Sequence, residues 1–148
     1  MNIEIYLYDQ VEVLDFAGPF EVFSTASRIC SSGPPFTVFT VGETGETITA
    51  RGGLSVNPAY GFDNHPQIDG LIVAGGVHSD EIQKTNVLDW VFKVAEKTKI
   101  TASACTGVFL PAEADTVTTQ HVTTHGEDIS DLQKSYPGLL VQLGKRWG

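Results

Sequence analysis

The chain has 148 residues, of which 41% are hydrophobic and 18% are charged, and its formal net charge is −9. This length suits one domain with a buried core, and no apolar run approaches the roughly 18 residues of a membrane-spanning helix. An acidic surface repels phosphate backbones and anionic membranes, which disfavours nucleic acid and membranes as partners. Two cysteines cannot form a disulfide framework, and the N-terminus lacks the basic flank of a signal peptide, so we expect a cytoplasmic protein.

The first strand and the first helix are predicted near the N-terminus. In residues 3–8, aliphatic residues alternate with Glu4, Tyr6 and Tyr8, a pattern typical of a strand with two unlike faces. Gly18-Pro19 predicts the start of a helix, because proline is tolerated at a first helical position. The helical periodicity then continues to about residue 29.

The later elements continue this alternation. Strands are expected in the ranges 36–41, 47–50, 54–57, 68–74, 100–104, 121–124 and 139–143. The second and third of these form a hairpin that turns at a glycine pair. The range 100–104 is interpreted as a buried central strand, since it is short and its side chains are small or β-branched. Asn86 predicts the cap of a second helix, and a third helix is expected from near Glu127 to Pro137-Gly138.

Strands that alternate with helices predict βαβ units. The sequence therefore indicates a single α/β domain over residues 1–148, with a mostly parallel sheet and helices on both of its faces. Such sheets bind ligands beyond the carboxyl ends of their strands. This rule directs attention to three junctions, at residues 14–15, 74–78 and 104–107.

Cys105 lies where a predicted strand meets a predicted helix. Small residues on both sides of it suit a strand–turn–helix elbow, in which the turn residue projects outward. A thiol at a helix N-terminus is stabilised as the thiolate, so we expect the pKa of Cys105 to fall below the ordinary value of about 8.5. The alternative is a small buried hydrophobic residue, which is the commonest fate of a free cysteine. Cys30, at the end of the first helix, is interpreted as structural.

Two other junctions carry candidate site residues. Gly75 and Gly76 follow the most apolar strand, and their backbone N–H groups could stabilise a developing negative charge, or simply form an ordinary turn. Asp15 lies between Leu14 and Phe16, where partial burial would raise its pKa and let it carry a proton. The residues alone favour a helix N-cap for Asp15.

Taken together, these segments resemble the ThiJ/PfpI family, whose fold is flavodoxin-like and similar to that of class I glutamine amidotransferases. The resemblance covers nearly the whole chain and is carried by LDFAGPFEVF (14–23), DGLIVAGG (69–76), SACTGVFLPAEA (103–114) and VTTHGEDI (122–129). Within the family, the chain is most similar to isonitrile hydratase-like members, because Thr106 follows the cysteine where the protease-like branch has histidine.

The resemblance implies a role for each candidate. Cys105 would be the nucleophile, Asp15 its acid–base partner and Thr106 a hydrogen-bonding neighbour. Gly75, Gly76 and the N–H of residue 106 would form an anion hole. The implied reaction hydrates an isonitrile to an N-substituted formamide, with a small neutral substrate and with no metal or organic cofactor.

The sequence also departs from the family pattern. It stops before the final strand and helix of the family, which would leave a strand edge uncovered and favours a homodimer. Pro111 lies inside the helix expected after Cys105, so that helix should kink or start late. At residues 115–119 the family usually has a small residue, two aliphatic residues and a glycine turn, and this chain does not. Gly126 stands where the family has an aromatic residue.

The histidines give weaker signals. His121 and His125 have HxxxH spacing, but the β-branched residues between them favour a strand, on which they would be too far apart to chelate a metal. His125 is a candidate pocket residue, since relatives place a histidine of this segment near the cysteine. His78 could line the pocket mouth or lie on the surface, and His65 is interpreted as a turn residue. No set of residues has zinc-site spacing.

Three other functions remain open at this point. The same thiol could attack aldehydes, as in glyoxalase or deglycase members of the family. The domain could instead be a ligand sensor, because related domains precede the helix-turn-helix segment in transcriptional regulators. Oxidation of Cys105 to a sulfinic acid would make the protein a redox sensor.

Overall fold

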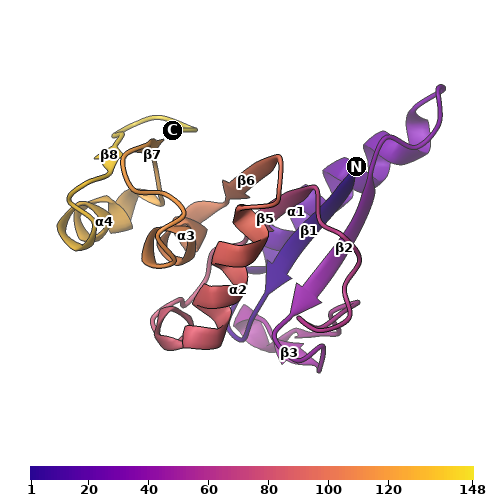
Figure 1. Ribbon diagram of the computed structural model, residues 1–148, viewed down its shortest axis with the longest axis horizontal. Helices are drawn as coiled ribbons and strands as arrows, with labels where there is room; N and C mark the ends of the chain where they lie inside the picture. The colour runs from indigo at the N-terminus through magenta and orange to yellow at the C-terminus, as the bar shows by residue number, and fades with distance from the viewer.

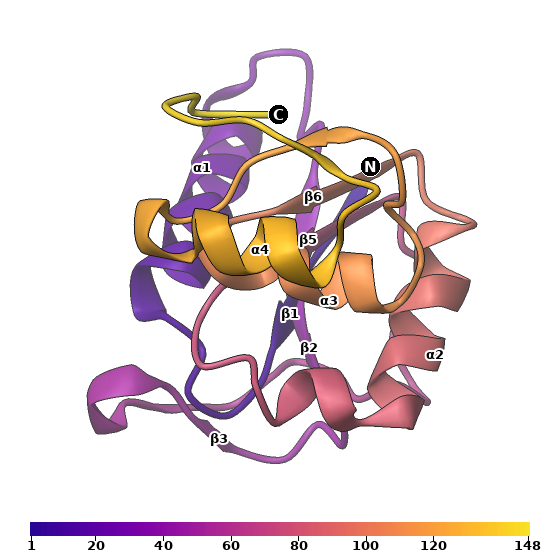
Figure 2. The ribbon, with the colours of Figure 1, turned by 90° about the vertical axis from the view of Figure 1, so that its left-hand side faces the viewer.

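The computed structural model describes all of residues 1–148 and has a parallel four-stranded sheet at its centre, in the order β2–β1–β5–β6. These strands are β1 (Asn2–Leu7), β2 (Thr37–Gly42), β5 (Gly70–Val73) and β6 (Ile100–Ser103). Helix α1 (Val13–Ile29) covers one face of the sheet and α2 (Thr85–Ala95) covers the other (Figures 1 and 2). The prediction of a mostly parallel α/β sheet with helices on both faces is confirmed.

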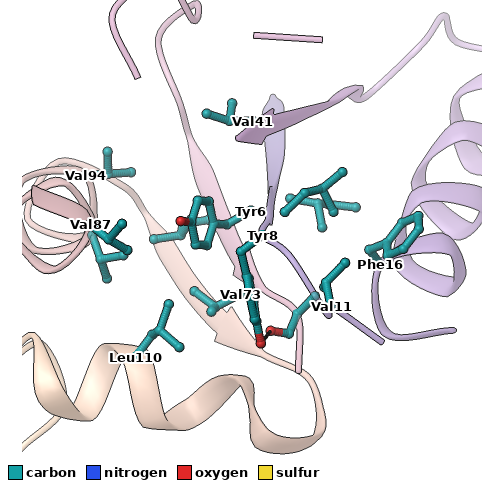
Figure 3. Close-up of a cluster of buried hydrophobic side chains, with 14 of the residues drawn as sticks. Tyr6, Tyr8, Val11, Phe16, Val41, Val73, Val87, Val94 and Leu110 are labelled. Carbon is teal, nitrogen blue, oxygen red and sulfur yellow. Dashed lines mark hydrogen bonds between the residues drawn. The ribbon is translucent and has the colours of Figure 1, made fainter. Parts of the chain in front are cut away.

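Strand β1 is buried on both faces, which the alternating sequence pattern did not predict. It pairs with β2 on one side and with β5 on the other, so both of its edges are satisfied. Tyr6 and Tyr8 pack under α2 and α3 (Phe109–Glu113), whereas Phe16 of α1 lies on the opposite side of the strands (Figure 3). Glu4 shares the face of Tyr6 and is fully buried. The two unlike faces of β1 are therefore both buried.

Strand β6 is an edge strand, and the expectation of a buried central strand was wrong. It pairs only with β5, from Gly70↔Ile100 to Val73↔Ser103. Three of its four residues are exposed, and Ile100 is 59% exposed. Small β-branched residues suit an edge position as well as a central one, so composition could not distinguish the two.

Two helices begin earlier than the capping residues predicted. Helix α1 starts at Val13, which leaves Pro19 inside it at the seventh position. Helix α2 starts at Thr85, and the side chain of Asn86 donates a hydrogen bond to Glu43 instead of capping the helix. In both helices the packing of apolar residues against the sheet outweighs the local capping preference.

A small C-terminal unit packs against one end of the sheet. It contains β7 (His121–Val122), the 3-10 turn Gly126–Asp128, α4 (Ile129–Ser135) and β8 (Leu140–Val141). The two strands pair in parallel, and the unit shares a second apolar core with α3, made of Val108, Phe109, Ala112, Val122, Leu132 and Leu139. This packing brings the segment after β7 close to Cys105.

The remaining elements are short. The predicted hairpin is present as β3 (Ile48–Thr49) and β4 (Ser55–Val56), joined through the 3-10 turn Arg51–Gly53. A further 3-10 turn, Glu81–Gln83, precedes α2. None of the helices has the length and apolar character needed to cross a membrane.

Candidate active site

Cys105 occupies the turn after β6, as the elbow prediction required. Its backbone φ is +53°, in the left-handed region that residues other than glycine seldom adopt. A 3-10 turn follows at Cys105–Val108, and α3 begins only at Phe109. Gly107 lets this turn approach β5, because a methyl group there would lie 2.9 Å from the carbonyl carbon of Val73. Pro111 lies in the first turn of α3, so the late helix start is confirmed.

Asp15 approaches the same turn from α1. It is the third residue of that helix, so the expectation of an N-cap was wrong; the N-cap is Glu12. The N–H of Glu12 donates to the carbonyl of Gly75 at 2.8 Å, which holds the start of α1 against the turn after β5. A methyl group on Gly75 would lie 2.6 Å from Oδ2 of Asp15 and 2.8 Å from the nitrogen of Thr106. Glycine at position 75 therefore lets the carboxylate sit beside the elbow.

Asp15 and Cys105 line the same cavity and perturb each other's pKa. Burial raises the pKa of Asp15, although hydrogen bonding by the Cys105 thiol and by the backbone of Gly75 partly opposes this shift. Oδ2 is buried without a well-aligned partner. Each of the two groups therefore shifts the pKa of the other.

The pKa of Cys105 is raised, and the expectation of a lowered value was wrong. Burial is the largest cause, the backbone N–H of Thr106 opposes it, and the negative charges of Asp15 and Asp128 add to it. The helix dipole contributes little, because the thiol precedes a single 3-10 turn and a helix of only five residues. Burial and the neighbouring carboxylates therefore both disfavour the thiolate form of Cys105.

Thr106 ties the two glycine-containing turns together. Its Oγ1 accepts a hydrogen bond from the N–H of Gly76 at 2.9 Å and donates to the carbonyl of Gly76 at 3.0 Å. Gly76 has φ +150°, and a methyl group there would lie 2.7 Å from Cα of Val11. The N–H of Gly76 is thus already bonded and is not free for the predicted anion hole.

These residues open into one cavity of about 570 Å³. Its lining brings together Asp15, Gly76, Cys105, Thr106 and His125 among the predicted site residues. His125 is exposed, and its Nε2 lies 3.9 Å from the Glu127 carboxylate. Gly75 lies behind the cavity wall, against Asp15.

Sequence reasoning missed several other cavity residues. Glu12, Arg51, Glu127 and Asp128 line it, and His78, whose place was left open, also lines it. Arg51 comes from the β3–β4 turn, which no local motif connects to Cys105. Thr124 donates to the carbonyl of Cys105 at 3.0 Å and so anchors the elbow to the C-terminal unit.

The other histidines lie elsewhere. The ring of His65 accepts a hydrogen bond from the indole of Trp90 at 3.2 Å, and His121 faces Gln142. No three His, Cys, Asp or Glu side chains are grouped as metal ligands. A separate hollow of about 380 Å³, between β6 and the C-terminal segment, contains none of the candidate residues.

The DJ-1/PfpI family profile matches residues 1–138. The chain belongs to the DJ-1/PfpI family. It is 26% identical to an isonitrile hydratase of Pseudomonas putida over 97% of this chain and 57% of that protein. It is 28% identical to an uncharacterised protein of Streptomyces lividans over 92% of this chain and 95% of the relative.

Other DJ-1/PfpI relatives have different functions or show only the fold. The helix-turn-helix regulator GbdR of Pseudomonas aeruginosa is 24% identical over 95% of this chain and 38% of its own length. A solved ThiJ/PfpI protein from Pseudomonas syringae superposes with a TM-score of 0.83 at 19% identity, over 97% of this chain and 57% of that one. The family therefore includes an enzyme and a regulator, and this chain spans little more than half of the hydratase.

Proposed function

We propose that the protein is a cysteine-dependent hydratase that converts an isonitrile into an N-substituted formamide. The observation that carries this proposal is the pairing of Cys105, on a strained elbow, with the partly buried carboxyl of Asp15 at the wall of an open cavity. The likeness to an isonitrile hydratase supports the choice of reaction.

The first half of the reaction uses the proton of the Cys105 thiol. The Cys105 thiol passes its proton to the Asp15 carboxylate, and the thiolate sulfur attacks the terminal carbon of the isonitrile. Asp15 then gives the same proton to that carbon, which yields a thioimidate, R–N=CH–S–Cys105. The raised pKa of Asp15 suits this step, because a carboxyl group that holds its proton more firmly can deliver it near neutral pH.

The second half releases the product. Asp15 takes a proton from water as the water oxygen adds to the thioimidate carbon, and it gives that proton to the substrate nitrogen. The carbon–sulfur bond then breaks as the new hydroxyl group becomes the carbonyl, and the hydroxyl proton passes to the sulfur. The products are R–NH–CHO and the free thiol, so the net reaction adds one water molecule to R–NC. No oxidant or external cofactor enters this balance.

The charges around the cavity support a neutral substrate. Glu12, Glu127 and Asp128 line it together with Asp15, whereas Arg51 is the only lysine or arginine and already lies 3.5 Å from the Glu12 carboxylate. An anionic substrate would be repelled by this lining. An isonitrile carries no net charge, so it meets no such barrier.

Turnover of cyclohexyl isonitrile tests the proposal directly. Purified protein should produce N-cyclohexylformamide, and Cys105→Ala should abolish the product. Cys30→Ser is the matched control, because Cys30 ends α1 and contacts Ser32 outside the cavity. Absence of the formamide, or equal turnover by Cys105→Ala, would refute the proposal.

A ligand-binding module is the second candidate, because the pKa of Cys105 is raised and a regulator is among the relatives. Such a module would bind a small molecule in the same cavity without consuming it. The wild-type protein would then bind cyclohexyl isonitrile without forming the formamide, which separates the two functions.

A further inference from the structure

Part of the backbone around the cavity is already hydrogen-bonded within the protein. The N–H of Gly76 is bonded to Thr106, and the N–H of Val77 donates to the carbonyl of Gln10 at 3.1 Å. The N–H groups of Gly75 and Thr106 lower the pKa of Asp15 and of Cys105, respectively, so they act on the protein's own reactive groups. Two N–H groups of the turn after β5 are therefore already bonded within the protein, which favours a side chain as the donor to the substrate.

His78 is a side chain held in place to do this. It lines the cavity of Cys105, and its ring stacks on Phe109 of α3 with the ring centroids 4.2 Å apart and the planes 19° from parallel. Its carbonyl accepts a hydrogen bond from the N–H of Ile82 at 3.0 Å. The ring is thus fixed by packing on one side and by its backbone on the other.

The two ring nitrogens of His78 have different surroundings. Nδ1 is buried and has no hydrogen-bond partner, whereas Nε2 is neither buried nor bonded to the protein. A buried N–H without an acceptor is the less tolerated of the two unpaired states. The neutral ring therefore carries its proton on Nε2, at the side that solvent reaches.

We propose that Nε2–H of His78 donates a hydrogen bond to the substrate nitrogen and takes the place of a backbone anion hole. This inference rests on the proposed hydration. As water adds to the thioimidate, electron density moves from the C=N bond onto that nitrogen, and a donor there stabilises the transition state. No bond to His78 forms or breaks. The site therefore suits a substrate that, once Cys105 has attacked its carbon, carries a neutral acceptor nitrogen next to that carbon.

Substitution of His78 by phenylalanine removes the donor and keeps an aromatic ring on Phe109. We expect His78→Phe to lower kcat for cyclohexyl isonitrile about tenfold, because one hydrogen bond to the transition state is lost, and to change KM little. The thioimidate should accumulate, seen by intact mass spectrometry as the protein plus one isonitrile. His121→Phe, outside the cavity, is the matched control. Wild-type turnover by His78→Phe would overturn the inference.

A second measurement stands apart from turnover. Nitrogen-15 NMR of the histidine rings in neutral buffer should show His78 protonated on Nε2, and titration with N-cyclohexylformamide should shift that resonance. Binding of the formamide should weaken about tenfold in His78→Phe. Protonation on Nδ1, or no shift, would overturn the inference. If the isonitrile is not hydrated but these NMR results are obtained, only the proposed reaction is refuted.

Discussion

Glu4 provides a prediction whose magnitude follows from its burial. The side chain is fully buried on β1, and neither of its carboxylate oxygens has a hydrogen-bond partner. Burial raises the pKa of Glu4 well above its ordinary value, so the folded protein binds a proton that the unfolded chain releases near pH 4.3. Because the folded state binds more protons, this group's contribution to stability is full below about pH 4.3 and is lost as the pH rises.

Replacing Glu4 by glutamine removes this dependence. Each unit by which the pH rises above the unfolded value costs the wild type up to about 1.4 kcal/mol, so from about pH 4.3 to 6.3 Glu4→Gln should gain up to roughly 2 kcal/mol relative to the wild type. For a chain of this length, a gain of roughly 2 kcal/mol raises the melting temperature of Glu4→Gln relative to that of the wild type by about 4–8 °C. Urea unfolding at both pH values measures the difference.

The matched control is Glu96→Gln, since Glu96 is exposed at the end of α2 and has no ion pair. Its difference from the wild type should stay nearly constant with pH. If the free energy of unfolding of Glu4→Gln also differs from that of the wild type by a constant amount at all pH values, the proposed burial of a protonated carboxyl is refuted.

Two further substitutions test the construction of the elbow. Gly107→Ala should destabilise the protein by about 1–3 kcal/mol or more in urea unfolding, because the new methyl group meets the backbone of Val73, whereas Gly126→Ala, with open space around it, should be nearly neutral. Equal effects would contradict the close approach. Thr106→Val removes both hydrogen bonds to Gly76 and should cost about 1–3 kcal/mol, with reduced turnover of cyclohexyl isonitrile; unchanged stability and turnover would show that this link is dispensable.

Much of the fold could be predicted from local pattern. The apolar run ending at residue 74 and the elbow at Cys105 each follow from short-range sequence, and both lie where expected. The position of a strand within the sheet does not follow from such patterns, because it depends on which other strands pair with it. For this reason β1 proved to be buried on both faces and β6 proved to be an edge.

The chemistry of the site was harder to predict than the residues that form it. Small residues around Cys105 indicated the turn, but the pKa of its thiol depends on the charge of Asp15 and on the length of the helix that follows. Likewise, the glycines at 75 and 76 suggested free N–H groups, yet the Thr106 side chain occupies one of them. Such interactions join residues up to 90 positions apart along the chain, and no single segment contains both partners.

The coupling between Asp15 and Cys105 is the central claim, and the pH dependence of Cys105 alkylation tests it most directly. Iodoacetamide rates should be compared in Cys30→Ser and in Cys30→Ser with Asp15→Asn, because hydrogen bonding with Ser32 lowers the pKa of the Cys30 thiol, which would otherwise react as well. Asn at position 15 removes a negative charge beside the sulfur, so the midpoint of the rate profile should move to lower pH. An unchanged midpoint would show that the carboxylate does not act on the thiol and would contradict the proposed site.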